Sequence, residues 1–249
     1  MLTKQTVKFT KSLQNKKFRR LYNQFIIEGE KSVLEVLSSD FKIQKLLVTS
    51  YFHAKYKELL APFSGIIELA GDTELDSIGS LQSNDAAIAV CAVNEVLLPE
   101  TIKGEWVIAL DNINDPGNLG TIIRIADWYG ISKIICSEDT ADFYNPKVIN
   151  ASKGSFLRVK VHYTDLSAFL KQQRVSVYGA DLHGENIHTA SFKEVGILVM
   201  GNEAHGISEG VKACITQMLT IPRFGQAESL NVGIATAICC DRIKSAQSV

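Results

Sequence analysis

The 249-residue sequence lacks any apolar run near the roughly 18 residues that a membrane-spanning helix needs. Its first residues are basic, without the apolar block of a signal peptide. Its cysteines form no CxxC pair and no regular spacing with histidine, which excludes zinc sites and disulfide frameworks; they are Cys91, Cys136, Cys214, Cys239 and Cys240. We therefore expect a cytoplasmic protein with reduced, mostly buried thiols, no membrane contact and no metal.

An excess of charge of one sign is also missing. The chain carries 26 basic and 27 acidic residues, a net charge of -1, which argues against a protein that binds nucleic acid over its whole surface. Seven basic residues nevertheless precede the first acidic residue, Glu28. They are Lys4, Lys8, Lys11, Lys16, Lys17, Arg19 and Arg20. This basic arm, residues 1–24, is either a solvated or frayed terminal helix or a segment that contacts phosphates.

Hydrophobic residues make up 46% of the chain, enough for a buried core. Residues 25–94 alternate short apolar runs with helical patterns and predict a small α/β domain. Residues 95–104 have no clear period and form the expected linker. In residues 105–249 the apolar runs are again short and alternate with helical patterns, which predicts a mainly parallel sheet covered on both faces. Ligands of such sheets bind at the carboxyl ends of the strands.

A first polar motif follows the apolar run that ends near Asp111. Pro116 and Gly117 fit a tight turn, and Asn118 can cap the helix that follows. The residues of that helix with apolar spacing are Leu119, Ile122, Ile123 and Ala126. Arg124 falls off this stripe and is either a surface ion-pair partner or a functional residue. The turn matches neither GxGxxG nor a Walker loop, so an ordinary nucleotide-binding α/β enzyme has little support.

A second motif, GNEAHGIS, directly follows a buried strand. Gly201 and Gly206 permit close approach of a ligand to the backbone, although they also suit a tight turn. Glu203 is an acid-base group, a hydrogen-bond anchor or a surface carboxylate. Ser208 can cap the next helix.

A third motif leads from Ile221 through a loop into an apolar helix. Ser229 is expected to cap this helix, which would begin at Leu230 and carry Asn231 in its first turn. Ser229 has no evident histidine partner and no GxSxG elbow surrounds it, which excludes a serine hydrolase.

In this order the three motifs resemble the signature motifs of the SpoU/TrmH-type RNA ribose 2′-O-methyltransferases of the SPOUT superfamily. The matching stretches are NLGTIIR, GNEAHGIS and IPxxGxxxSLNV, and FIIEGEKSVLEVL resembles the start of the family's substrate-binding domain. One departure is Arg223, where the family commonly has Met.

The resemblance implies a SPOUT-type α/β domain with a deep trefoil knot at residues 105–249. It also implies a small ribosomal-protein-like RNA-binding domain at residues 25–94, which would select the RNA, and a homodimer. The implied partner is structured RNA, either rRNA or tRNA, methylated on a ribose 2′-hydroxyl.

The resemblance further implies S-adenosyl-L-methionine as cofactor. The residues that would hold it are Leu182, Gly201, Ile221 and Leu230, and the implied catalytic residues are Arg124, Asn118, Glu203, Ser229 and Asn231. A guanidinium is not deprotonated near neutral pH, so we expect Arg124 to hold the target phosphate and orient the hydroxyl. The proton would leave through the phosphate, Ser229 or water. The alternative function is a non-catalytic RNA-binding or ribosome-assembly factor on the same fold.

Overall fold

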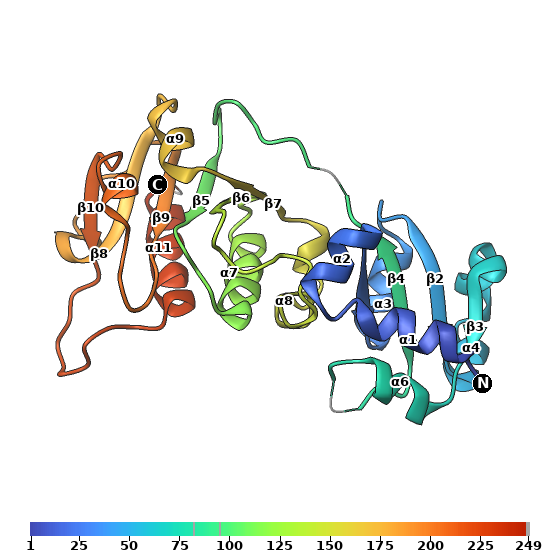
Figure 1. Cartoon of the computed structure of the whole chain (residues 1–249). Helices are drawn as coiled ribbons and strands as arrows, with labels where there is room; N and C mark the ends of the chain where they lie inside the picture. Colours follow the sequence, from blue (N-terminus) through green and yellow to red (C-terminus); the bar gives the residue numbers. More distant parts are fainter. Residues whose placement is uncertain (82, 95, 248–249) are drawn as a thin grey trace. The chain divides into compact units, whose positions relative to one another are not determined.

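The computed structural model describes residues 1–81, 83–94 and 96–247 (Figure 1). Residue 95, at which the linker is expected to begin, and residues 248–249 at the end of the C-terminal domain lie outside this part. Within the described ranges, no helix is both long and apolar enough to cross a membrane. All five cysteines are free thiols and all but Cys214 are buried, which confirms the prediction for them.

The chain folds into two compact units. Unit 1 comprises Met1–Glu95 and Asp142–Leu157, and unit 2 comprises Val96–Ala141 and Arg158–Val249. The first boundary falls where the linker is expected. The sequence prediction had placed the whole of residues 105–249 in one domain, and the structure differs because the middle segment of that stretch belongs to unit 1.

Unit 1 is built on a four-stranded mixed sheet in the order β1-β4-β2-β3, in which β2 and β3 are parallel and the other neighbours antiparallel. Its strands are β1 (Gln24–Glu28), β2 (Ile43–Val48), β3 (Ile67–Leu69) and β4 (Ala87–Ala92). Its helices are α1 (Lys4–Ser12), α2 (Lys16–Tyr22), α3 (Glu30–Leu37), α4 (Ser50–Lys55), α5 (Lys57–Leu60), α6 (Asp72–Ile78) and α8 (Pro146–Ser152), with 3-10 turns η1 (Ala61–Ile66) and η2 (Ser155–Leu157).

Aromatic contacts explain why the segment around α8 belongs to unit 1. The ring of Tyr144 lies 4.5 Å from that of Phe25 in β1, and Phe156 lies 6.2 Å from Phe41. Phe156 and Phe25 are buried. Burying large rings removes apolar surface from water, so these contacts hold the segment on the sheet of unit 1.

The basic arm is folded rather than frayed. It forms α1 and α2, and Leu13 between them is fully buried in the core that α6 also lines. The guanidinium of Arg19 is buried too. It donates to the carbonyl oxygens of Leu13 and Gln14 at 2.9 and 2.7 Å and pairs with Asp142 at 2.5 Å. A frayed terminus is therefore wrong, whereas a solvated helix agrees with the exposure of the other six basic residues.

Unit 2 contains a six-stranded sheet in the order β10-β8-β9-β5-β6-β7, in which every neighbouring pair is parallel. The strands are β5 (Trp106–Leu110), β6 (Lys133–Ser137), β7 (Lys160–Thr164), β8 (Ser176–Asn186), β9 (Gly196–Met200) and β10 (Gln217–Thr220). The helices are α7 (Pro116–Trp128), α9 (Leu166–Lys171), α10 (Glu209–Lys212) and α11 (Val232–Gln247). The predicted parallel sheet is confirmed.

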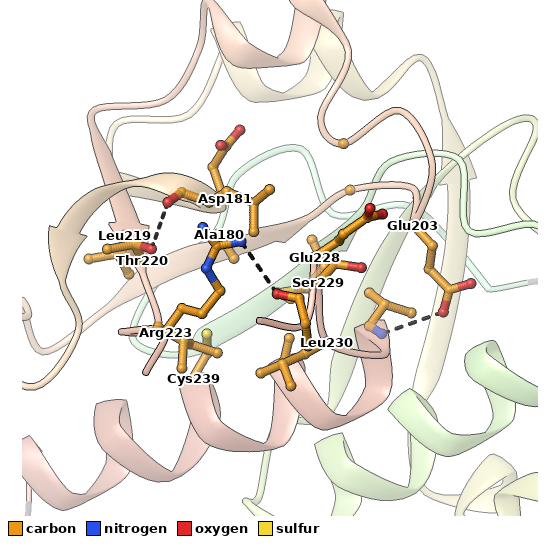
Figure 2. A pocket seen from close by; sticks show the side chains of 18 of the residues that line it. Ala180, Asp181, Glu203, Leu219, Thr220, Arg223, Glu228, Ser229, Leu230 and Cys239 are labelled. Atoms are coloured by element: carbon orange, nitrogen blue, oxygen red, sulfur yellow. Dashed lines mark hydrogen bonds between the residues drawn. The ribbon is translucent and has the colours of Figure 1, made fainter. Parts of the chain in front are cut away.

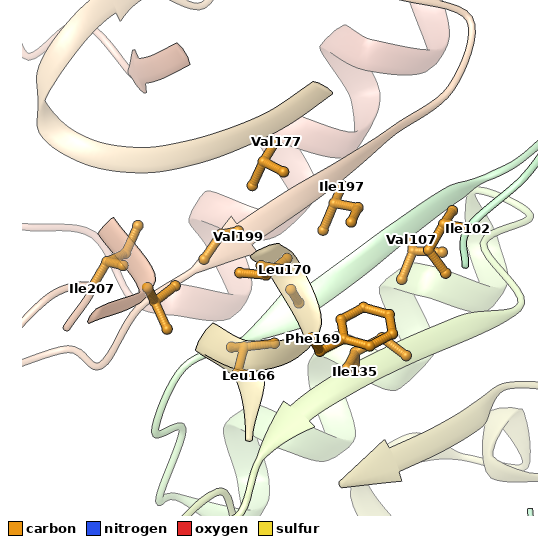
Figure 3. Packing of buried hydrophobic residues seen from close by; sticks show 12 residues of the cluster. Ile102, Val107, Ile135, Leu166, Phe169, Leu170, Val177, Ile197, Val199 and Ile207 are labelled. Carbon is orange, nitrogen blue, oxygen red and sulfur yellow. The ribbon is translucent and has the colours of Figure 1, made fainter. Parts of the chain in front are cut away.

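Helices cover both faces of this sheet. Val107 of β5 packs with Phe169 of α9 in the core shown in Figure 3. Successive strand residues point to opposite faces, so Trp106 lies on the other side, against Phe192. The guanidinium of Arg242 in α11 lies over the ring of Phe192, and α11 contacts α7. Because helices cover both faces of the sheet, a ligand is expected to bind at the carboxyl ends of the strands.

Candidate functional site

The first motif forms the turn from β5 into α7. The helix begins at Pro116, and its N-cap is Asp115, whose carboxylate accepts a hydrogen bond from the backbone N–H of Asn118 at 2.8 Å. The prediction that Asn118 caps the helix is wrong, because proline suits the first helical position and moves the cap one residue before it. Gly117 lies in the first helical turn and not in a separate tight turn. The side chain of Asn118 is left for contacts outside the helix.

The second motif forms a tight loop after β9. Gly201 has to be glycine, because a Cβ there would lie 2.4 Å from the backbone carbon of Gly206. Asn202 and Gly206 exchange backbone hydrogen bonds of 3.0 and 2.8 Å, and Gly206 adopts a φ of +67°. The side-chain oxygen of Asn202 also accepts from the N–H of Ala204 at 2.9 Å. These bonds fix the loop that carries Glu203.

Two further hydrogen bonds join this loop to the first motif. Asp111, buried at the end of β5, accepts from the backbone N–H of Ser208 at 2.7 Å. Asn202 donates to the carbonyl oxygen of Asn112 at 2.8 Å. Ser208 occupies the N-cap position of α10, as predicted, but its side chain makes no capping hydrogen bond.

The third motif ends in the first turn of α11. The helix begins at Val232, not at Leu230, and its first N–H groups are capped by Asn231, whose side-chain oxygen accepts from Gly233 at 2.9 Å. Ser229 therefore does not cap the helix as predicted. It belongs to an exposed loop that runs from β10 to α11.

Glu203 is the point at which the three motifs meet. Its Oε1 accepts from the side-chain amide of Asn118 at 2.6 Å and from that of Asn231 at 3.2 Å. Asn231 also donates to the side-chain oxygen of Asn118 at 3.0 Å. The triangle of Asn118, Glu203 and Asn231 supports the role of hydrogen-bond anchor among the alternatives for Glu203.

A cavity of about 540 Å³ opens beside this triangle. It lies among the ends of β8, β9 and β10 and the start of α11 (Figure 2). The four residues expected to hold a cofactor all line it, together with two expected catalytic residues. These six are Leu182, Gly201, Ile221, Leu230, Glu203 and Ser229. The structure thus brings together residues that are up to 48 positions apart in the sequence.

Arg124 stands apart from the cavity. It is exposed on α7 and is absent from the cavity lining, unlike Glu203. Among the described residues, none forms an ion pair or hydrogen bond with its guanidinium. Asn118 and Asn231 do not line the cavity either, but both bond to Glu203, so of the five expected catalytic residues Arg124 is the one that neither lines the cavity nor bonds to a residue that does.

Three charged residues of the cavity were given no site role from the sequence, although Arg223 was noted as a departure from the family: Asp181, Arg223 and Glu228. Arg223 donates to the carbonyl oxygen of Ala227 at 3.3 Å and so braces the loop over the cavity (Figure 2). Their positions in the sequence could have indicated them, since Asp181 directly precedes Leu182 and the other two lie inside the third motif. With Glu203, the lining carries three carboxylates and one guanidinium, which favours a ligand with net positive charge.

Cys239 of α11 also lines the cavity. Burial raises the pKa of this thiol to about 12, so it is protonated at neutral pH and is not a thiolate nucleophile. Within the described part of the chain, no group of three or more His, Cys, Asp or Glu residues is placed to hold a metal ion.

Two family models match the sequence. The SpoU rRNA Methylase family matches residues 105–241, and the MRM3-like substrate binding domain matches residues 4–89. The chain is 33% identical over 238 residues to the 23S rRNA (guanosine(2553)-2′-O)-methyltransferase RlmP of Bacillus subtilis, covering 94% of each protein. It is 34% identical over 154 residues to the 23S rRNA (guanosine-2′-O-)-methyltransferase RlmB of Ralstonia nicotianae, covering 59% of this chain and 62% of that protein.

Solved structures agree with these matches over nearly the whole chain. A putative RNA methyltransferase of the TrmH family from Porphyromonas gingivalis superposes with a TM-score of 0.83 at 34% identity, covering 98% of both chains. The AdoMet-bound rRNA methyltransferase from Sinorhizobium meliloti gives 0.87 at 28% identity, covering 98% of this chain and 96% of that one.

Proposed function

The chain belongs to the SpoU rRNA methylase family, and we infer from its site that it transfers a methyl group from S-adenosyl-L-methionine to a ribose 2′-hydroxyl of RNA. The observation that carries this function is the triangle of Asn118, Glu203 and Asn231 at the edge of the cavity. Three motifs that are remote in sequence converge there.

The cavity suits this cofactor in size and charge. Its volume of about 540 Å³ lies within the range of roughly 300–1,000 Å³ typical of small-molecule sites. The cofactor carries a sulfonium and an ammonium against one carboxylate, which matches the excess of carboxylates in the lining. We assign the apolar contacts to Leu182, Ile221 and Leu230, and the close backbone approach to Gly201. When bound, S-adenosyl-L-methionine supplies a methyl group on a positively charged sulfur.

The acceptor has to be held in line with that methyl group, because a 2′-hydroxyl is a weak nucleophile. We assign this role to Arg124, whose guanidinium would bind the phosphate next to the target ribose. A guanidinium keeps its protons near neutral pH, so Arg124 orients the hydroxyl and does not act as its base. The proton would pass to the phosphate, to Ser229 or to water.

Glu203 anchors the site in this proposal. Its Oε1 accepts from both Asn118 and Asn231, so it ties the start of α7 to the start of α11. We assign the three residues to fixing the reacting groups in position, since preorganised hydrogen bonds need not rearrange during the reaction.

The test of Arg124 is the Arg124→Ala variant. We expect methyl transfer to RNA to vanish while calorimetry shows unchanged cofactor affinity, because the residue does not line the cavity. Arg158→Ala on the same unit is the matched control, since that exposed arginine pairs with Asp127. Full activity of Arg124→Ala would contradict its role. If the wild-type protein bound no cofactor, the non-catalytic RNA-binding factor would take the place of the enzyme.

For the substrate we propose a ribose of large-subunit ribosomal RNA, because relatives named as 23S rRNA guanosine 2′-O-methyltransferases include one that covers 94% of this chain. Residues 25–94 would act in selecting it, in line with the match to a substrate binding domain. Mapping 2′-O-methyl groups in total RNA from cells with and without the protein tests this. A lost methyl group in transfer RNA, with ribosomal RNA unchanged, would contradict it.

We also propose that unit 2 contains a deep trefoil knot and that the protein is a homodimer. Exposed apolar side chains on the two contacting helices support a dimer, since Trp128 of α7 is 83% exposed and Ile234 of α11 is 55% exposed. A dimer would let Arg124 serve the partner's cavity. Restored activity on mixing the Arg124→Ala and Glu203→Ala variants would support this, whereas a monomer in sedimentation would contradict it. The cytoplasmic location stays a prediction.

A further inference from the structure

The two N-terminal helices of unit 1 present a group of free cations. With Arg19 buried, the other six basic residues of the segment are exposed: Lys4, Lys8, Lys11, Lys16, Lys17 and Arg20. Together with the rings of Phe9, Phe18 and Tyr22, these six residues are called the α1–α2 surface. None of the six forms an ion pair with a residue in the described ranges. Lys4, Lys8 and Lys11 follow the spacing of one helix face and so lie along one side of α1.

Unit 1 has seven other lysines. Three of them pair with glutamates: Lys31 with Glu35, Lys45 with Glu68, and Lys55 with Glu30. No acidic residue precedes Glu28, and Glu28 itself is buried. Glu74 and Glu68 lie beside α1, where they accept from the N–H of Leu2 at 2.9 Å and the hydroxyl of Thr6 at 3.0 Å, but neither forms an ion pair with a cation of the α1–α2 surface. A cluster of unpaired cations attracts a polyanion, and phosphate backbones bind to such clusters with release of counterions.

Aromatic rings join the two helices. The ring of Phe9 in α1 lies 5.0 Å from that of Tyr22 in α2, edge to face, and Phe18 stacks against Tyr22 at 6.2 Å. Tyr22 remains 44% exposed, and its neighbour Leu21 is 65% exposed. An exposed ring among cations is the combination on which unpaired bases stack while the phosphates are held. Duplex RNA does not offer its bases in this way.

The surface is held in a defined geometry. Asn15 caps α2, and Asn23 ends it in a left-handed conformation with φ of 51°. Arg19 fixes the turn between the helices through two carbonyl oxygens and Asp142. A surface that is ordered before binding loses little entropy when its partner arrives.

We propose that the α1–α2 surface binds a single-stranded segment of the substrate RNA, with its cations on the phosphates and Tyr22 stacked on an unpaired base. The proposal rests on the proposed function only in taking RNA as the substrate. It names the part of unit 1 that makes contact and the form of RNA that it takes.

The cations are tested with the triple variant Lys8→Gln, Lys11→Gln, Arg20→Gln. Its matched control has the same charge change elsewhere on unit 1: Lys31→Gln, Lys42→Gln, Lys57→Gln. The probe is a short single-stranded RNA, with binding measured over a range of salt concentrations. We expect the test variant to bind more weakly and the slope of log K against log salt to fall by about 0.7 per lost phosphate contact. Equal weakening in both triples would overturn the proposal.

The stacking is tested at Tyr22. Tyr22→Leu keeps an apolar side chain against Phe9 but removes the ring, and we expect single-stranded RNA to bind about 5- to 150-fold more weakly. Tyr22→Phe keeps the ring and should bind as the wild type does. Thermal denaturation of both variants shows whether α2 is intact. Equal binding by Tyr22→Leu and Tyr22→Phe would overturn the stacked base.

Activity separates this proposal from the proposed function. The triple variant should raise the KM for RNA and leave kcat and calorimetric cofactor affinity unchanged. Failure of the wild-type protein to bind the cofactor would remove the proposed function, whatever the α1–α2 surface does. Loss of binding to anionic lipid vesicles in the triple variant, with RNA binding unchanged, would assign the surface to a membrane and overturn the RNA proposal.

Discussion

Asp115 caps α7, and this leaves the side chain of Asn118 free to join two other segments. Had Asn118 been the cap, its side-chain oxygen would have been used by the N–H groups of its own helix. Instead its amide nitrogen reaches Glu203 and its oxygen accepts from Asn231. Asp115 caps the helix and Asn118 bonds to the other motifs, and this division lets α7 take part in the site.

At this scale the telling variant is Asn118→Asp. The substitution replaces the amide nitrogen of Asn118, which lies 2.6 Å from Glu203 Oε1, with a carboxylate oxygen. Two carboxylates then face each other and repel. Hydrogen bonds to charged groups contribute about 1.5–3 kcal/mol, and we expect kcat to fall by about 10- to 150-fold. The melting temperature should change little, because Asp115 still caps the helix. Steady-state methylation and thermal denaturation measure the two effects; undiminished kcat would contradict the anchoring role.

The first turn of helix α11 stabilises the fold and also contributes to the site. Asn231 caps the helix through its side-chain oxygen and donates to Glu203 and Asn118 through its nitrogen. The element is therefore placed by the same residue that completes the triangle.

A pair of variants separates these two functions of Asn231. Serine is a good N-cap and alanine a poor one, so Asn231→Ala should lower the free energy of unfolding by about 1 kcal/mol relative to Asn231→Ser. Both variants lose the amide donor and should lose activity to a similar degree. Urea titration and methylation assays give the two quantities. Equal stability of the two variants would show that the cap does not hold α11.

The elements also show how far the sequence could be interpreted. Apolar runs predicted the parallel strands, and helical spacing predicted the buried stripe of α7, because both patterns are local. The starts of α7 and α11 were wrong, since Asp115, Asn118, Ser229 and Asn231 all have capping side chains. Pro116 at the first helical position decides for Asp115 in α7. The contacts of Asn118 and Asn231 with Glu203 are contained in no local pattern. The role expected for Arg124 came only from the family resemblance, since the local pattern left a surface ion-pair partner and a functional residue as alternatives.

In the whole molecule, burial suppresses the acidity of most thiols. It raises the pKa of Cys91 and Cys239 to about 12 and raises those of Cys136 and Cys240 as well. These groups are neutral in the folded protein at pH values where they ionise in the unfolded chain, whose thiols have a pKa of about 8.5. The folded state thus binds more protons than the unfolded state above that pH.

The free energy of unfolding should therefore be independent of these thiols below about pH 8 and fall as the pH rises from about 9 toward 12. Each thiol contributes a slope of about 1.4 kcal/mol per pH unit in that window. Urea titrations at a series of alkaline pH values measure the slope, and Cys91→Ala should reduce it by one such increment. A slope that is the same in Cys91→Ala and the wild type would contradict the prediction.

The chain passes between the two units three times, after residues 95, 141 and 157. A gene fusion that replaced residues 1–95 with an unrelated domain would remove Phe25 and Phe41, and Tyr144 and Phe156 would lose their contacts with these two rings. Recombination at a single junction therefore cannot give this enzyme a new specificity without exposing apolar rings to water. We expect its choice of RNA to have diverged by point substitutions rather than by exchange of a domain. Substitutions around α8 should accompany substitutions in β1.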